Sequence, residues 1–166
     1  MTGIPLVTEK RKNTELLSRS NLGYAKDVTT NNLILPKYIF FGKGSNGTTF
    51  ASSEKKVTFN QYDSKGNIQQ YTMENGSSVI ILWGYGKTVP IAKIENATYE
   101  QIAAALGIST TALNAYDENN LTAINGLRNN AALSNSQIMT YTYIPSVGVS
   151  TITDAKDDKI TYTYDS

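Results

Sequence analysis

Alternation of apolar and polar residues is the main pattern in the middle of the chain, and it predicts β-strands. Residues 57–62 (Val-Thr-Phe-Asn-Gln-Tyr) alternate as a half-buried strand should. After a polar turn, residues 68–73 run back. Asn75-Gly76 is a strong hairpin signal, because both residue types tolerate a positive φ. The run 79–83 (Val-Ile-Ile-Leu-Trp) is apolar enough for a strand that is buried on both faces.

The same texture occurs before and after this region. A short apolar run, 37–41, stops at a glycine, and strand-like patterns return at 138–144, 147–153 and 160–164. The chain is rich in Tyr, Thr and Ser, residue types that suit strands. We therefore expect a mainly β fold, an antiparallel meander of strand-turn-strand units.

A helical pattern interrupts the strands. Thr98 is suited to be an N-cap, and Gln101 three residues later completes a capping box. Gly107 is well placed to end this helix. Apolar residues at helical spacing lie between the cap and the glycine: Tyr99, Ile102, Ala103 and Leu106.

Two further short helices are predicted at 110–116 and 121–127. The segment 96–135 is thus expected to hold a short helical insertion, about 98–130, inside one domain that comprises residues 1–166.

An internal repeat relates two strand regions. A shift of 81 residues relates the segments 57–95 and 138–166: it superposes 57–85 on 138–166 without a gap, and apolar or aromatic positions coincide. Recurring strand-turn-strand units of this kind indicate a repeat architecture. The second copy stops at Ser166, where the first continues, so we expect the chain to be a fragment of a longer repeat protein. The coinciding pairs include Val57 and Ile138, Tyr62 and Tyr143, Ile68 and Val149, Thr72 and Thr153, Val79 and Ile160, and Trp83 and Tyr164.

Composition argues against most catalytic chemistry. The chain has no Cys and no His, which removes the usual thiol nucleophile, imidazole base and most metal ligands. No carboxylate pair stands out from spacing. We therefore expect no catalytic, cofactor-binding or metal-binding residues, and no enzyme.

Charge argues against a nucleic-acid partner. The chain has fifteen basic and fourteen acidic residues, so it is close to neutral. Residues 98–116 have the turn and spacing of a DNA-binding helix-turn-helix, but residues 94–127 contain no Lys or Arg. Since phosphate contacts supply most non-specific affinity, DNA binding through this segment is disfavoured. No stretch is long and apolar enough to cross a membrane.

Two other motifs are weak. Residues 42–47 fit GxGxxG, but the following Thr-Thr-Phe suits a strand and not the helix that a dinucleotide site needs. An acidic turn at Asp154, Asp157 and Asp158 lacks the spacing of a calcium loop, so a solvated turn is favoured.

The turn motifs resemble a known repeat family. Tyr62-Asp63-Ser64-Lys65-Gly66-Asn67-Ile68 is similar to the Tyr-Asp-x-x-Gly-Arg-Leu core of RHS repeats (YD repeats), with Asn67 where Arg is usual. Tyr164-Asp165 resembles the start of another unit. The segments 83–97 and 141–149 resemble stretches of RHS-repeat proteins of Bacteroidetes, so the likeness covers residues 57–166.

The resemblance implies a scaffold without chemistry of its own. RHS repeats coil into long sheets in exported or surface proteins, so it implies an extracytoplasmic structural segment whose partners are neighbouring repeats or domains. In the motif, Asp63 should hold the turn by accepting backbone N–H groups, and Gly66 should supply an unusual φ. The repeat-motif residues are Tyr62, Asp63, Gly66, Tyr164 and Asp165.

An aromatic row offers an alternative function. Aromatic side chains recur on the predicted strands, and alternate positions on a strand share one face. An exposed row could bind a carbohydrate or a protein; if the row is the core, it binds nothing. The residues of this candidate binding face are Trp83, Tyr85, Tyr143 and Tyr164.

Overall fold

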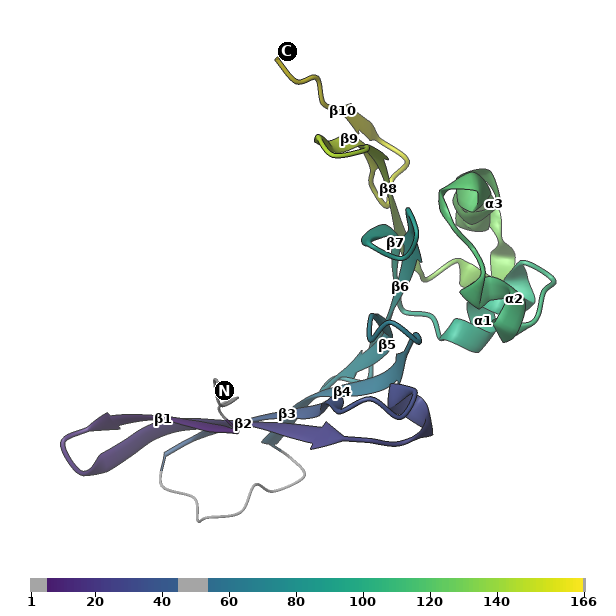
Figure 1. The fold of residues 1–166 in the computed structure, drawn as a ribbon. Coiled ribbons are helices and arrows are strands. Elements are labelled where there is room, and N and C mark those ends of the chain that lie inside the picture. The colour runs from purple at the N-terminus through teal and green to yellow at the C-terminus, as the bar shows by residue number, and fades with distance from the viewer. Residues whose placement is uncertain (1–5, 45–53, 166) are drawn as a thin grey trace. The chain divides into compact units, whose positions relative to one another are not determined.

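The computed structural model describes residues 6–44 and 54–165. Its strands form a ten-stranded antiparallel meander in chain order, from β1 to β10, with a helical insertion between β7 and β8 (Figure 1). The prediction of a mainly β meander with a helical insertion is therefore confirmed. The chain forms two compact units, Met1–Gly76 and Ser77–Ser166, and each is described separately.

The first unit is a run of hairpins. Its strands are β1 (Val7–Lys12), β2 (Glu15–Ala25), β3 (Leu35–Lys43), β4 (Lys55–Tyr62) and β5 (Ile68–Met73). A single 3-10 turn, η1 (Val28–Thr30), lies in the connection from β2 to β3. Its Asp27 cap accepts the N–H groups of Thr29 and Thr30.

The second unit combines strands with the insertion. Its strands are β6 (Ser78–Gly84), β7 (Val89–Glu95), β8 (Gln137–Ile144), β9 (Gly148–Thr153) and β10 (Lys159–Thr161). As its apolar run predicts, β6 buries Val79, Ile80 and Leu82, which include adjacent positions and so both faces.

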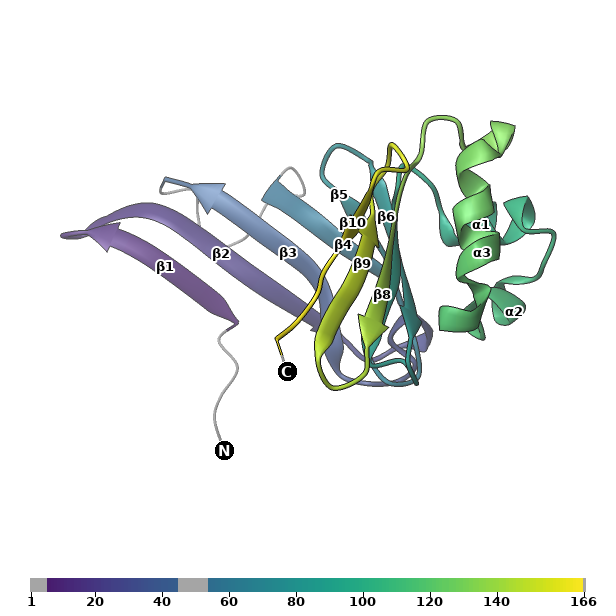
Figure 2. The same ribbon diagram turned by 90° about the horizontal axis from the view of Figure 1, so that it is seen from above.

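The insertion contains three short helices, which lie on one face of the strands of this unit (Figure 2). They are α1 (Tyr99–Ala105), α2 (Thr110–Asn114) and α3 (Leu121–Gly126). Three 3-10 turns complete it: η3 (Glu118–Asn120), η4 (Leu127–Asn129) and η5 (Ala131–Leu133).

The predicted capping box of α1 is present. The Thr98 side chain accepts the Gln101 N–H, and the Gln101 Oε1 accepts the Thr98 N–H. Gly107 follows the helix with a φ of +70°, which an L side chain rarely adopts. Helices this short are marginal alone, so packing on the strands must supply most of their stability.

The hydrophobic core of the second unit lies between the strands and the helices. Ile80, Ile91 and Ile94 from β6 and β7 are fully buried there. From the insertion, α1, α2 and α3 contribute a buried set, which is Tyr99, Ile102, Ala103, Leu113 and Ile124. The three helices of the insertion therefore use their apolar positions to cover the sheet.

Some strand boundaries differ from the predicted ones. The predicted strand 160–164 is wrong in its length, because β10 ends at Thr161 and Tyr164 lies beyond it. The sequence analysis predicts no separate strand for β7 and no strand boundaries within residues 7–25. The second half of the GxGxxG motif, residues 45–47, lies outside the described residues.

Candidate functional site

Asp63 builds the turn between β4 and β5. Its Oδ1 accepts the N–H groups of Lys65 and Asn67, each at 2.9 Å, and its Oδ2 accepts the Asn67 Nδ2–H at 3.0 Å. Asp63 is only 4% exposed. Gly66 has a φ of +84°, so both predicted roles in the motif are confirmed.

We expect Asp63→Ala to lower the free energy of unfolding by about 2 kcal/mol, because it leaves two N–H groups of a partly buried turn without an acceptor. Asp63→Asn should cost less, since its amide oxygen can still accept one of them. Urea unfolding followed by circular dichroism measures both variants. Equal stability of the alanine variant and the wild type would contradict this role.

A second acidic turn has the same construction. The Asp154 Oδ1 accepts the N–H groups of Lys156 at 2.8 Å and Asp158 at 2.9 Å. Asp157 has a φ of +72° and lies 81 residues after Gly76, whose φ is +85°. The acidic residues here therefore have a turn-forming role, and the described residues contain no group of three or more metal-ligating side chains.

The two hairpins that the 81-residue shift superposes share their register at the turn. Tyr62 pairs with Ile68 and Gln61 with Gln70, with a bulge between Gln61 and Tyr62. The equivalents behave alike: Tyr143 pairs with Val149, Thr142 pairs with Thr151, and a bulge separates Thr142 from Tyr143. A bulge changes the direction of the side chain that follows it. Because the same bulge precedes Tyr62 and Tyr143, the two side chains start from equivalent backbone geometry.

A recurring hydrogen bond uses these tyrosines. Tyr62 donates its hydroxyl to the Pro36 carbonyl oxygen at 2.6 Å, and Tyr143 donates to that of Pro90 at 2.9 Å. Each acceptor is the second residue of the preceding strand, and each pairs with an aromatic residue one strand further back, Tyr24 for Pro36 and Trp83 for Pro90.

Tyr164 follows the same rule. It donates its hydroxyl to the carbonyl oxygen of Val149, the residue that pairs with Tyr143. A Cβ at Gly148 would lie 2.5 Å from the Tyr164 Oη, so the glycine makes room for this ring. These tyrosines thus connect β4 to β3, β8 to β7, and the segment after β10 to β9.

Burial raises the pKa of Tyr62 to about 12, and repulsion from Tyr24 adds to this shift. The unfolded chain releases the Tyr62 proton near pH 10, whereas the folded chain keeps it. The stability that comes from this difference is complete below pH 10 and is lost as the pH rises to about 12.

We therefore expect Tyr62→Phe to flatten the fall in stability between pH 10 and about 12 relative to the wild type. At neutral pH the same change should cost about 1 kcal/mol, one buried hydrogen bond. Denaturant unfolding at several pH values tests both expectations. A pH dependence identical to that of the wild type would contradict them.

The candidate binding face is only partly on strands. Trp83 lies on β6 and Tyr143 on β8, and both are half-buried. Tyr85 lies after the end of β6 with a φ of 50°, and Tyr164 lies after β10, so strand alternation does not govern either residue. Tyr85 and Tyr143 do meet, with ring centroids 5.4 Å apart in an edge-to-face arrangement.

The hydroxyls of this set have partners inside the protein. The Tyr143 N–H donates to the Tyr85 Oη at 3.0 Å, and the Tyr143 and Tyr164 hydroxyls bind backbone carbonyls as described above. What remains available is ring surface, chiefly that of Tyr164, which is 46% exposed.

An open groove of about 520 Å³ lies beside the Tyr85–Tyr143 pair. Its other walls are Thr88 and Val89 at the start of β7 and the turn from β8 to β9. The lining residues of the turn are Ile144, Pro145, Ser146, Val147, Gly148 and Val149. Sequence patterns did not predict this groove, because it requires two turns that are more than 50 residues apart to adjoin.

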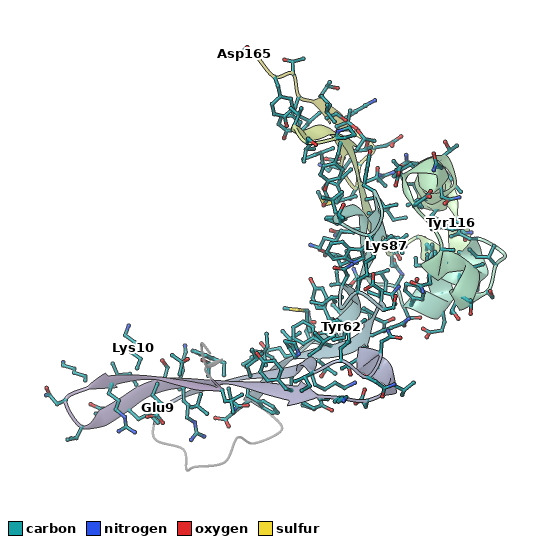
Figure 3. The ribbon with its side chains drawn as sticks, viewed as in Figure 1. Glu9, Lys10, Tyr62, Lys87, Tyr116 and Asp165 are labelled. Atoms are coloured by element: carbon teal, nitrogen blue, oxygen red, sulfur yellow. The ribbon has the colours of Figure 1, made fainter. Side chains whose placement is uncertain are left out.

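Two side chains, Glu118 and Lys87, form hydrogen bonds between the insertion and the end of β6 with the turn that follows it. Glu118 accepts the Tyr85 backbone N–H at 2.5 Å. Lys87 donates its Nζ–H groups to the carbonyl oxygens of Trp83 at 3.1 Å and Tyr116 at 2.8 Å; Figure 3 shows Lys87 and Tyr116 next to each other. The insertion therefore has a fixed place on its own sheet.

Arg128 fastens the other end of the insertion. Its Nη1 donates to the carbonyl oxygens of Ile138 and Asp154, and its Nη2 lies 3.4 Å from that of Thr153. Asp157 Oδ1 lies 3.4 Å from the buried Nε. Sequence patterns did not predict this role, since a single arginine after a helix usually lies in solvent.

No helix among the described residues is long and apolar enough to span a membrane. No family model matches the chain, and no curated protein or solved structure matches it either.

Proposed function

We propose that this chain is a non-catalytic structural segment built from RHS-like strand-turn-strand repeats, part of a larger exported or surface protein. The observation that carries the proposal is the recurring bond from Tyr62, Tyr143 and Tyr164 to the carbonyl of the preceding strand. Side chains that repeat along the sheet serve to connect strand to strand, which is what a scaffold requires.

The turn chemistry supports the same proposal. Asp63 and Asp154 give both of their turn-facing contacts to backbone N–H groups, and Gly66 and Asp157 supply the positive φ. Of these residues, Asp63 and Gly66 belong to the YD-like motif, whereas Asp154 and Asp157 build a similar turn outside it. Their carboxylates are occupied in building turns, so their presence does not call for a substrate.

Fractionation of the source cells tests the proposal. An antibody against this chain should detect it in the surface or secreted fraction, in a polypeptide that is longer than 166 residues. Mass spectrometry of that polypeptide should find further Tyr-Asp-x-x-Gly units. A polypeptide of this length in the cytoplasm would contradict the proposal.

The alternative is a carbohydrate-binding module that uses the aromatic residues. This alternative is supported by the partial exposure of Trp83 and by the exposed ring of Tyr164, since both rings offer aromatic surface to a ligand. Fluorescence of Trp83, the one tryptophan, should then change on addition of candidate oligosaccharides. Fluorescence and quencher access that stay constant with sugar would end this alternative.

A further inference from the structure

The β4–β5 turn of the first unit and the β8–β9 turn of the second unit are equivalent, and the surface beside each turn is built from equivalent residues. In the first unit, Leu35 precedes Pro36, whose carbonyl accepts the Tyr62 hydroxyl. In the second, Val89 precedes Pro90, whose carbonyl accepts the Tyr143 hydroxyl. The residue pairs Ala25–Leu35 and Gly84–Val89 both follow a bulge.

In the first unit this place is filled by the chain itself. The connection from β2 to β3 turns back over the β4–β5 turn, where Asn31 donates its Nδ2–H to the Tyr62 carbonyl oxygen at 2.6 Å. A Cβ on Gly66 would lie 3.6 Å from Leu35 Cδ1 and 3.7 Å from Leu33 Cδ1. Aliphatic side chains therefore cover this turn.

In the second unit the same place is open. The connection from β6 to β7 is only residues 85–88, and Tyr85 takes the position of Asn31, with its Oη 3.4 Å from the Tyr143 carbonyl oxygen. The connection carries no leucine, and the groove of about 520 Å³ lies there instead. Val147, 81 residues after Gly66, is 55% exposed at its rim, and Ile144 is 41% exposed.

The connection that fills the first place also exposes two aliphatic side chains. Val28 is 84% exposed and Ile34 is 72% exposed, the highest values for large apolar residues in the described part of the chain. Leaving both in water forgoes the stabilisation that burial of aliphatic side chains gives. Val28 and Ile34 thus form an exposed aliphatic protrusion (the knob), and the same polypeptide carries a largely apolar groove.

We propose that the groove beside Tyr85, Tyr143 and Val147 binds the β2–β3 connection of a second copy of this chain, with Ile34 as the inserted side chain. The internal template gives the reason: an aliphatic residue of this connection, Leu33, covers the equivalent turn in the first unit. The contact joins different surfaces of the two copies, so it can repeat from copy to copy without closing.

Sedimentation velocity over a concentration series up to about 1 mM tests the proposal. The wild type should associate beyond a dimer as its concentration rises. Ile34→Lys (knob) and Val147→Lys (groove) should each weaken association at least about tenfold, since each places a charge in an apolar contact. Both residues are exposed, so both variants should fold, which circular dichroism verifies.

Mixing the two variants gives the sharpest result. The groove of the Ile34→Lys variant is intact, and so is the knob of the Val147→Lys variant, so an equimolar mixture should form heterodimers that grow no further. Ile160→Lys, equally exposed at 54% but outside the groove, is the matched control and should associate as the wild type does. A wild type that stays monomeric, or a mixture without heterodimers, overturns the proposal.

Discussion

Replacement of Arg128 by methionine is expected to lower the free energy of unfolding by about 3 kcal/mol. The guanidinium is almost wholly buried and donates to carbonyl oxygens of β8 and of the β9–β10 turn, notably those of Ile138 and Asp154. Methionine keeps most of the side-chain volume but donates nothing, so these carbonyls lose their partner. Denaturant unfolding followed by circular dichroism measures the change.

Arg11→Met is the matched control for this experiment. Arg11 pairs with Glu9 at 2.9 Å, but its side chain is 49% exposed, and exposed ion pairs contribute little. We expect a change of less than about 0.5 kcal/mol for the control. Similar losses for both arginines would show that Arg128 does not act as the fastening between insertion and strands.

Gly84→Ala is expected to lower the free energy of unfolding by about 2 kcal/mol or more. A Cβ at this position would lie 2.5 Å from Ile91 Cγ2, 2.9 Å from Glu118 Oε2 and 3.1 Å from the Glu118 backbone N. Ile91 is fully buried, and the Glu118 backbone is part of η3, so neither can move away freely. The close approach of the insertion to β6 therefore depends on a glycine.

Gly126→Ala serves as the control for Gly84. Gly126 has a φ of −59°, and a Cβ there would meet nothing within 4 Å. At such a position alanine should be neutral or should stabilise by about 0.5 kcal/mol, because it restricts the unfolded chain. Thermal unfolding should thus occur at a lower temperature for Gly84→Ala than for the wild type, and at an equal or higher temperature for Gly126→Ala. A Gly84→Ala variant as stable as the wild type would contradict the proposed packing.

The predictions that succeeded rest on local interactions. The alternation of apolar and polar residues at 57–62 was sufficient to predict β4, although seven of its eight residues are half-buried and only Tyr62 is buried. The capping box of Thr98 and Gln101 and the turn held by Asp63 involve residues within four positions of each other. For interactions of this range, the residue types largely determine the geometry.

The predictions that failed or were missing depend on distant residues. Tyr164 was predicted on a strand because its pattern alternates, yet β10 ends at Thr161, and the Tyr164 hydroxyl reaches the Val149 carbonyl instead. Tyr85 was placed in a strand row, but the short β6–β7 turn gives it a positive φ. A periodicity rule describes which face a residue takes only while the strand continues.

The sequence by itself determined the strand and turn units, the helical insertion with its caps, and the repeat that relates 57–95 to 138–166. Only the tertiary structure decided which backbone carbonyl each tyrosine hydroxyl reaches, how Glu118 and Arg128 fasten the insertion, and where an aliphatic groove stays open. The reason is range: alternation and capping act between neighbours in the chain, whereas these contacts join residues 10 to 58 positions apart. Whether such residues meet depends on the register of the intervening strands.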